Sequence, residues 1–424
     1  MPDKYYKQLL KTKLIPIGAT LLPKFIAVFC GLALSRWLNL LPTAEFSQFN
    51  VTVKNLAIVA PFLTLALPIY THKFYTIHRD NYLQVSAVVS NFWTTFSIIK
   101  VFLFFVGFLI IWLITILVPN QNQAVWLGLF VLQSVLITDQ GYRAICDSFN
   151  KSWQFSITDL ISKLVQICLL IGSLYLFAIQ PNFNIYFWIS LLAYLISLLL
   201  DAIWQRQYTP PGKFDLNLIQ KYLPSILQLS LSAFIVGLYL NLDIPLLKYL
   251  NFNDSAINGY SNAYKLYETV GIIPGIISPI LASQAFGAIK NEPGKIYKWL
   301  AAIFGYSLVL LVGFNFFGPI VIKIIDSQQQ YVSYSNSVLG ILGFSFIFLA
   351  LGQFLGSINI FLGGEKFDLI GSIPTAFFAI LMYYYGISNF GLAGAAAASV
   401  GVYALDFCFK LFFFIKFLSR KQFT

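Results

Sequence analysis

The feature that most constrains this chain is a succession of long apolar runs on both sides of a single polar break. Residues 1–204 and 223–424 each divide into about six runs close to the roughly 20 residues that an α-helix needs to cross a bilayer. The longest polar stretch, 205–222, separates them. We therefore predict an all-α integral membrane protein with about twelve transmembrane helices, in which two six-helix lobes are joined by a linker.

Composition excludes most other classes of protein. Hydrophobic residues make up 58% of the chain and charged residues only 10%, against roughly a quarter charged in soluble domains. The formal net charge is +11, but the cations are scattered singly between apolar runs and form no basic face. A nucleic-acid partner is therefore not expected.

The predicted domains are an N-terminal lobe (1–204), a linker (205–222) and a C-terminal lobe (223–424). In the linker, Pro210 and Pro211 end the preceding helix because proline lacks an amide donor and restricts its neighbour. Apolar residues recur at helical spacing over 216–223, which predicts a short amphipathic helix on the membrane surface. The predicted spans are 14–34, 46–70, 92–118, 124–145, 155–178 and 183–204, then 223–250, 259–286, 299–325, 334–362, 367–387 and 391–417.

The distribution of basic residues predicts the orientation. One set of alternating segments holds 18 of the 27 lysines and arginines, and the opposite set holds only Arg36, Lys248 and Lys323. Basic residues accumulate in cytoplasmic loops. Both termini and the linker are therefore expected in the cytoplasm.

Little in the sequence favours an enzyme. The predicted external segments 119–123, 179–182 and 388–390 are too short to hold a catalytic site. His72 and His78 are the only histidines, and the four cysteines have no metal-type spacing. We expect no catalytic residue, no metal and no cofactor.

Most ionisable residues inside the predicted spans have a partner on their own helix. Three acid–base pairs are spaced i, i+4 with the acid first, which is the favourable order for a helical ion pair. We interpret them as structural pairs that neutralise themselves. They are Asp139 with Arg143, Asp159 with Lys163, and Asp406 with Lys410.

The intramembrane charges that are not explained locally lie on the first two predicted spans of each half. Lys24, Lys54 and Asp243 have no partner on their own helix, and Lys265 and Glu268 are spaced i, i+3. Charges in a membrane are costly, so a shared aqueous cavity between the halves would bury them most cheaply. Separate snorkelling to the surface, or partners on other helices, remains the alternative.

Three segments carry sequence motifs. In NLDIPLLKYLNFNDSAINGYSNAYKL (241–266), Asp243 precedes a short loop and a Gly-Tyr-x-x-Ala opening of the next span. The other two are LALSRWLNLLPTAEFSQF (32–49) and the loop LGGEK (362–366) after predicted span ten. Together they resemble the Wzx-type polysaccharide flippases of the multidrug/oligosaccharidyl-lipid/polysaccharide (MOP) exporter superfamily, although the second segment departs from the family's N-terminal pattern at Asn39 and at Phe46-Ser47.

The resemblance implies two six-helix lobes around a central cavity that opens alternately to each side. In that family the cavity is cationic and holds the head group of a polyprenyl-pyrophosphate-linked oligosaccharide, while the lipid tail stays among the membrane lipids. The implied function is flipping of such units across the bacterial cytoplasmic (inner) membrane for O-antigen (lipopolysaccharide) or capsule biosynthesis, beside a polysaccharide polymerase machinery. The implied substrate-binding residues are Lys24, Lys54, Asp243, Lys265 and Glu268.

Two other functions are carried as alternatives. A cation-coupled multidrug exporter of the same fold would favour a cavity dominated by acids and aromatic residues, and the unpaired lysines point away from it. A membrane enzyme such as a polysaccharide polymerase or ligase would need a larger external segment.

The topology can be tested by thiol labelling. In a variant whose natural cysteines are replaced by serine, Lys213→Cys should react with a membrane-impermeant maleimide only after the cells are opened, because the linker is expected in the cytoplasm. Labelling of this cysteine in intact cells would contradict the orientation.

Overall fold

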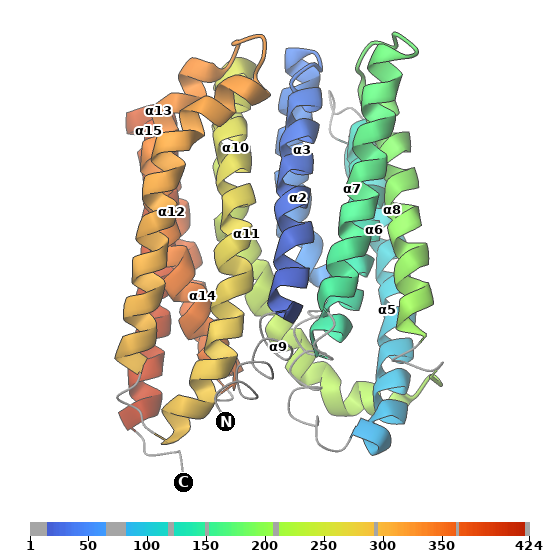
Figure 1. The fold of residues 1–424 in the computed structure, drawn as a ribbon, viewed down its shortest axis with the longest axis vertical. Helices are drawn as coiled ribbons and strands as arrows, with labels where there is room; N and C mark the ends of the chain where they lie inside the picture. Colours follow the sequence, from blue (N-terminus) through green and yellow to red (C-terminus); the bar gives the residue numbers. More distant parts are fainter. Residues whose placement is uncertain are drawn as a thin grey trace. The chain divides into compact units, whose positions relative to one another are not determined.

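The fold is known from a computed structural model, which describes residues 15–64, 82–117, 123–148, 152–206, 212–291, 296–361 and 364–419. These residues form thirteen α-helices and no strand (Figure 1). The predicted all-α fold is confirmed. The helices are α2 (Ile15–Leu38), α3 (Thr43–Thr64), α5 (Tyr82–Leu117), α6 (Gln123–Ser148), α7 (Ser152–Tyr175), α8 (Phe183–Gln205), α9 (Leu216–Asn241), α10 (Asp243–Tyr249), α11 (Asp254–Asn291), α12 (Ile296–Ile325), α13 (Val332–Gly343), α14 (Ser345–Phe361) and α15 (Glu365–Ser419).

Each predicted span falls on one or two of these helices. The span predicted at 223–250 is divided into α9 and α10, and the span at 334–362 is divided into α13 and α14, which meet at an angle of 45°. The last two predicted spans, 367–387 and 391–417, are the two arms of α15, which meet at the non-helical residue Gly391. The apolar runs therefore locate the helices well and the breaks inside them less well.

Six helices of the described part of the chain are long and apolar enough to cross a membrane, or seven if α13 and α14 together form one span. This is fewer than the twelve predicted spans. One reason is that α15 counts once although it contains two predicted spans. Another is that α3 and α11, which carry most of the candidate site, are not among the six.

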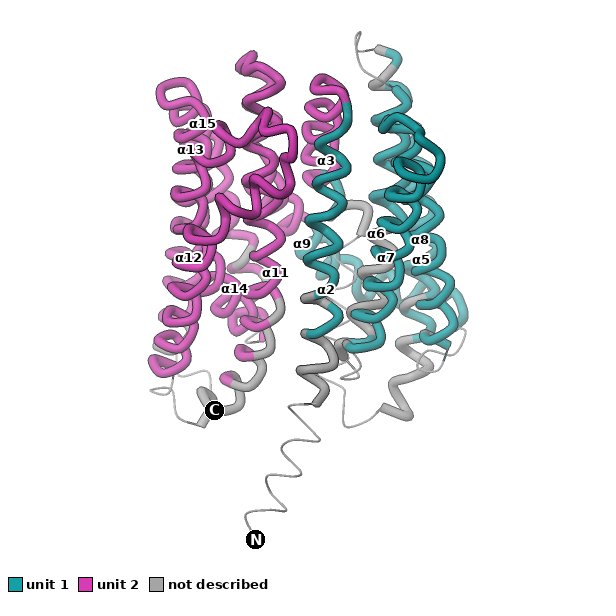
Figure 2. Tube along the Cα trace, turned by 45° about the horizontal axis from the view of Figure 1, so that its top comes forward, with its two compact units in different colours: residues 1–41, 59–230 teal, residues 42–58, 231–424 magenta. Residues whose placement is uncertain are grey.

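The chain divides into two compact units, which Figure 2 shows in different colours. Unit 1 comprises residues 1–41 and 59–230, and unit 2 comprises residues 42–58 and 231–424. The sequence assigns residues 42–58 to the N-terminal lobe, whereas in the structure they cluster with the C-terminal helices. The first part of α3 is thus an element of unit 2.

In unit 1, α7 packs against both α2 and α8. Polar side chains tie α7 to α8 inside this apolar bundle: the Gln166 amide donates to Ser190 Oγ at 2.6 Å, and Ser162 Oγ donates to the Ala193 carbonyl at 3.0 Å. Side-chain hydrogen bonds of this kind join helices where the surroundings offer no water. On α6, Gly128 leaves room for the Phe183 ring of α8.

The described end of the linker is attached to α5. The Lys213 amide donates to Asn91 Oδ1 at 2.6 Å, and the Asp215 amide donates to Thr95 Oγ1 at 3.0 Å. The first turns of α9 bury Leu218 against α5. Residues 216–222, which the sequence predicts as a separate amphipathic helix, are thus the beginning of the continuous helix α9.

In unit 2, α11 packs against α12, α13 and α14, and α14 also packs along α15. The two arms of α15 are joined at Gly391, whose φ of 59° is a conformation that glycine adopts without strain. Next to this joint, the backbones of Gly386 and Gly394 are in close contact. Their lack of a side chain is what allows the two arms to approach.

Gly394→Ala should therefore destabilise unit 2, because its Cβ would overlap the backbone carbonyl of Gly386. We expect a loss of about 1–3 kcal/mol in the free energy of unfolding, as is usual for an overpacked site. The matched control is Gly313→Ala, whose Cβ would meet nothing within 4 Å and which should be neutral. Equal unfolding temperatures of the two variants in detergent would contradict this packing.

Candidate functional site

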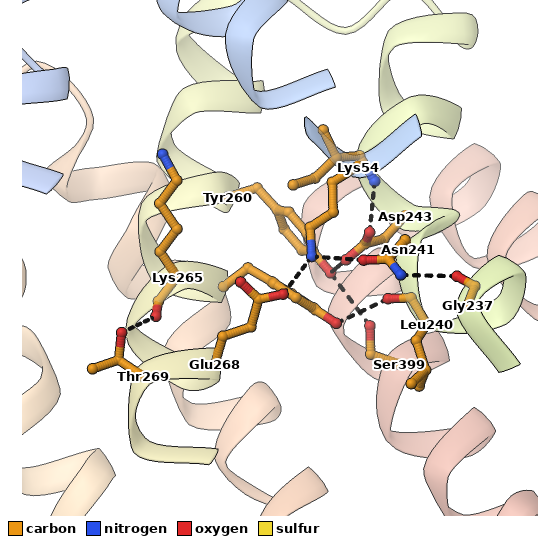
Figure 3. Close-up of polar contacts among 12 residues, drawn as sticks. Lys54, Gly237, Leu240, Asn241, Asp243, Tyr260, Lys265, Glu268, Thr269 and Ser399 are labelled. Carbon is orange, nitrogen blue, oxygen red and sulfur yellow. Dashed lines mark hydrogen bonds and ion pairs between the residues drawn. The ribbon is translucent and has the colours of Figure 1, made fainter. Parts of the chain in front are cut away.

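The centre of the candidate site is the ammonium group of Lys54 on α3, which is buried inside unit 2 (Figure 3). Its Nζ donates to Glu268 Oε1 at 2.6 Å and to Asn241 Oδ1 at 3.2 Å. It also lies 3.8 Å from the centroid of the Tyr264 ring, within the range of a cation–π contact. A carboxylate, an amide and an aromatic face thus replace the water that this cation would otherwise bind.

The two members of this ion pair differ in exposure. The Lys54 side chain is 7% exposed, whereas the Glu268 side chain is 49% exposed. Glu268 can therefore exchange its partner for water at low cost, but Lys54 cannot. Solvent thus reaches the ion pair through Glu268 and not through Lys54.

Asp243 begins α10, directly after the break that ends α9 at Asn241. Its side chain is fully buried. The Tyr260 hydroxyl donates to Oδ2 at 3.0 Å, and the Ile244 amide donates to Oδ1 at 2.8 Å. These donors satisfy both oxygens of the carboxylate.

Ser399 extends this buried polar cluster onto α15. Its Oγ lies 3.3 Å from the Tyr260 hydroxyl and 3.1 Å from the Tyr383 hydroxyl. Tyr260, Ser399 and Tyr383 thus form a connected chain that ends at the Asp243 carboxylate. The chain links α10, α11 and both arms of α15.

Lys265 lies on α11, one turn before Glu268, but the i, i+3 ion pair suggested by their spacing is not formed. Glu268 is bound to Lys54 instead, and Figure 3 shows the Lys265 side chain directed away from it. The Lys265 Nζ is buried and has no hydrogen-bond partner among the described residues. It lies over the rings of Phe46 and Phe49, at 4.5 and 5.3 Å from their centroids.

Four of the five predicted site residues thus lie together in unit 2: Lys54, Asp243, Lys265 and Glu268. Lys24, the fifth, lies on α2 in unit 1, and its side chain falls outside the described part of the structure. Lys54, which has no partner on its own helix, pairs with Glu268 on α11, a residue remote from it in sequence.

Sequence reasoning missed several uncharged residues of the site. They are Asn241, Tyr260, Tyr264, Tyr383 and Ser399. One signal could have identified two of them, since Tyr260 and Tyr264 are spaced i, i+4 on α11 and so share a face with Glu268.

Two of the three predicted structural pairs are confirmed. Lys163 lies 3.4 Å from Asp159, and Lys410 lies 2.7 Å from Asp406. Asp406 also accepts a hydrogen bond from the Tyr239 hydroxyl at 2.9 Å. The side chains of the third pair, Asp139 and Arg143, lie outside the described residues.

The described residues contain no group of three or more His, Cys, Asp and Glu that could hold a metal ion. The ion pair of Lys54 with Glu268 and the hydrogen bonds around Asp243 provide charge pairing and hydrogen bonding at the site. Such groups suit the binding and release of a charged ligand.

The sequence matches no known family model and no curated protein. Solved structures do match. An outward-facing multidrug resistance MATE family transporter of the MOP superfamily has a TM-score of 0.70 at 14% identity, over 95% of this chain and 97% of that chain. A mutant of the Vibrio cholerae MATE transporter VcmN has a TM-score of 0.67 at 14% identity, over 96% and 98%.

The lipid II flippase MurJ, in an inward closed conformation, has a TM-score of 0.66 at 14% identity, over 96% of this chain and 90% of that chain. The chain has the fold of the MOP transporters. At such low identity the likeness establishes the MOP fold alone, and this fold is shared by multidrug exporters and a lipid flippase.

The asymmetry of the central ion pair predicts an asymmetric response to mutation. Glu268→Met should lower the free energy of unfolding by about 1–3 kcal/mol, because it leaves a buried ammonium without its acid. Lys54→Met should cost less, since Glu268 can be hydrated, and the double variant should be more stable than Glu268→Met alone.

The matched control is Lys248→Met, which removes the more exposed ion pair of Lys248 with Asp254 at 2.8 Å. It should change stability by at most about 1 kcal/mol. Unfolding in detergent measures all four variants. Strictly additive effects of Lys54→Met and Glu268→Met would show that the two groups do not interact.

Proposed function

We propose that this protein flips a polyprenyl-pyrophosphate-linked oligosaccharide across the bacterial cytoplasmic membrane by alternating access, as a transporter rather than an enzyme. The product would supply the biosynthesis of a surface polysaccharide such as O-antigen or capsule. A polysaccharide polymerase machinery would act next on the flipped unit.

The observation that carries this proposal is the environment of Lys265. Its buried ammonium has aromatic faces beside it and no carboxylate bonded to it among the described residues. A cation kept in this state inside a bundle is poorly stabilised until an anion arrives. A pyrophosphate supplies several oxygens that accept charge-assisted hydrogen bonds from an ammonium.

Lys54 provides a second cation near the first, and Glu268 keeps it neutralised while no substrate is bound. Exchange of the Glu268 carboxylate for a phosphate oxygen preserves a charge-assisted bond to Lys54. Lys24 is also proposed to contact the substrate, on the basis of the sequence alone. The structural similarity to a lipid II flippase supports the proposal, because that protein uses the same fold to flip a lipid.

A cation-coupled multidrug exporter is the second candidate. It is favoured by the buried Asp243 with its tyrosine hydroxyls and by the half-exposed Glu268, since acids and aromatic residues suit a cationic ligand. The two functions make opposite demands. An anionic substrate needs the lysines, and a cationic one needs Glu268.

Complementation of a flippase-deficient strain distinguishes them. Lys265→Gln should reduce export of surface polysaccharide about tenfold or more, because a charge-assisted hydrogen bond contributes roughly 1.5–3 kcal/mol. Lys265→Arg should retain part of the activity because it keeps the charge. Membrane levels are compared by immunoblot. Full export by Lys265→Gln at normal protein level would remove this lysine from substrate binding.

A further inference from the structure

One face of α3 carries a row of four polar residues. Thr43, Ser47, Asn50 and Lys54 follow one another at intervals of four, three and four residues, so they share one side of the helix. We call them the α3 stripe. All four belong to unit 2, and Ser47, Asn50 and Lys54 are buried.

The α3 stripe is bonded mainly to α11. Asn258 joins two of its turns: its amide nitrogen donates to the Thr43 carbonyl at 2.9 Å, and its Oδ1 accepts from the Asn50 amide at 3.1 Å. The Tyr331 hydroxyl donates to Thr43 Oγ1 at 3.2 Å. Lys54 completes the contact through Glu268 at 2.6 Å.

Such a polar contact can open at a smaller cost than an apolar one. When apolar faces separate, their surface is exposed to water at about 25 cal/mol per Å². The amide and ammonium groups of the α3 stripe exchange their protein partners for water instead, and the net change per hydrogen bond is only about 0.5–1.5 kcal/mol.

The closed contact is also imperfect. The side-chain amide oxygen of Asn50, Oδ1, is buried and has no hydrogen-bond partner among the described residues. An unsatisfied buried acceptor disfavours the closed state, and hydration on opening would remove that penalty. A contact that served only to hold the fold together would gain from an apolar residue at this position.

We propose that the α3 stripe is a releasable contact between α3 and α11, and that the anionic head group of the substrate opens it by replacing Glu268 as the partner of Lys54. This inference rests on the proposed function for the chemistry of the releasing ligand. Glu268 is the member that can leave, because its side chain is half exposed whereas Lys54 is buried. Once it has left, the remaining hydrogen bonds between the stripe and α11 are those of Asn258 with Thr43 and Asn50, which join neutral groups.

Site-directed crosslinking tests this proposal. In a variant whose natural cysteines are replaced by serine, Asn50→Cys and Asn258→Cys place two thiols where the side chains now touch, and a short bifunctional thiol reagent should join them in nanodiscs. Undecaprenyl pyrophosphate should slow this crosslinking at least about fivefold, the lower end of typical coupling between sites. Undecaprenol, which has the same tail without the charge, should leave the rate unchanged.

Two controls accompany the measurement. Ser162→Cys with Ala193→Cys reports the contact of α7 with α8 in unit 1, and neither lipid should change its crosslinking rate. Adding Lys54→Gln should abolish the effect of undecaprenyl pyrophosphate on crosslinking between Asn50→Cys and Asn258→Cys, because the ammonium group that would bind the pyrophosphate is absent.

Binding of the lipid is measured separately, from the shift that it causes in the unfolding temperature. If undecaprenyl pyrophosphate binds and the crosslinking rate does not change, release of the α3 stripe is wrong and the proposed function survives. If undecaprenyl pyrophosphate does not bind at all, the proposed substrate class is wrong. Release of the α3 stripe by such a substrate is then also wrong. An equal effect of undecaprenol would show that the tail, and not the charge, acts on the contact.

Discussion

A lysine ammonium inside a bundle of apolar helices is costly to bury without an opposite charge and hydrogen-bond acceptors, because its transfer out of water removes its hydration. In this protein Glu268 supplies the charge and Asn241 an acceptor for Lys54. These bonds join α3, α9 and α11. They explain why residues 42–58 cluster with the C-terminal helices, although the rest of unit 2 begins only at Leu231.

The ion pair of Lys54 with Glu268 is also central to the proposed function. Its buried lysine and half-exposed glutamate form a pair in which only the acid can be exchanged. Lys265 adds a second cation that is held by aromatic faces. Asp243 has a different part, since its carboxylate is satisfied by Tyr260 and by a backbone amide. It stabilises the break between α9 and α10, at the place where Asn241 reaches Lys54.

The sequence predicts those features that depend on neighbouring residues. Runs of apolar residues locate the helices, and the i, i+4 spacing correctly predicts Asp159 with Lys163 and Asp406 with Lys410. Residue spacing cannot predict an ion pair between residues remote in sequence, such as Lys54 and Glu268, which are 214 residues apart. The same limit applies to Lys265, whose i, i+3 spacing suggests a pair with Glu268 that a stronger contact with Lys54 prevents. Helix α9 begins at Leu216 rather than after the linker because its first turns have α5 to pack against.

The most direct test of the central claim is flipping by the purified protein in proteoliposomes. A polyprenyl-pyrophosphate-linked disaccharide with a fluorescent label on its sugar is placed in both leaflets, and an impermeant reductant bleaches the outer one. If the protein flips this lipid, bleaching should proceed beyond the outer-leaflet fraction in vesicles that contain it and stop there in protein-free vesicles. Bleaching that stops at the same level in both, while the same proteoliposomes transport a cationic dye, would contradict the account.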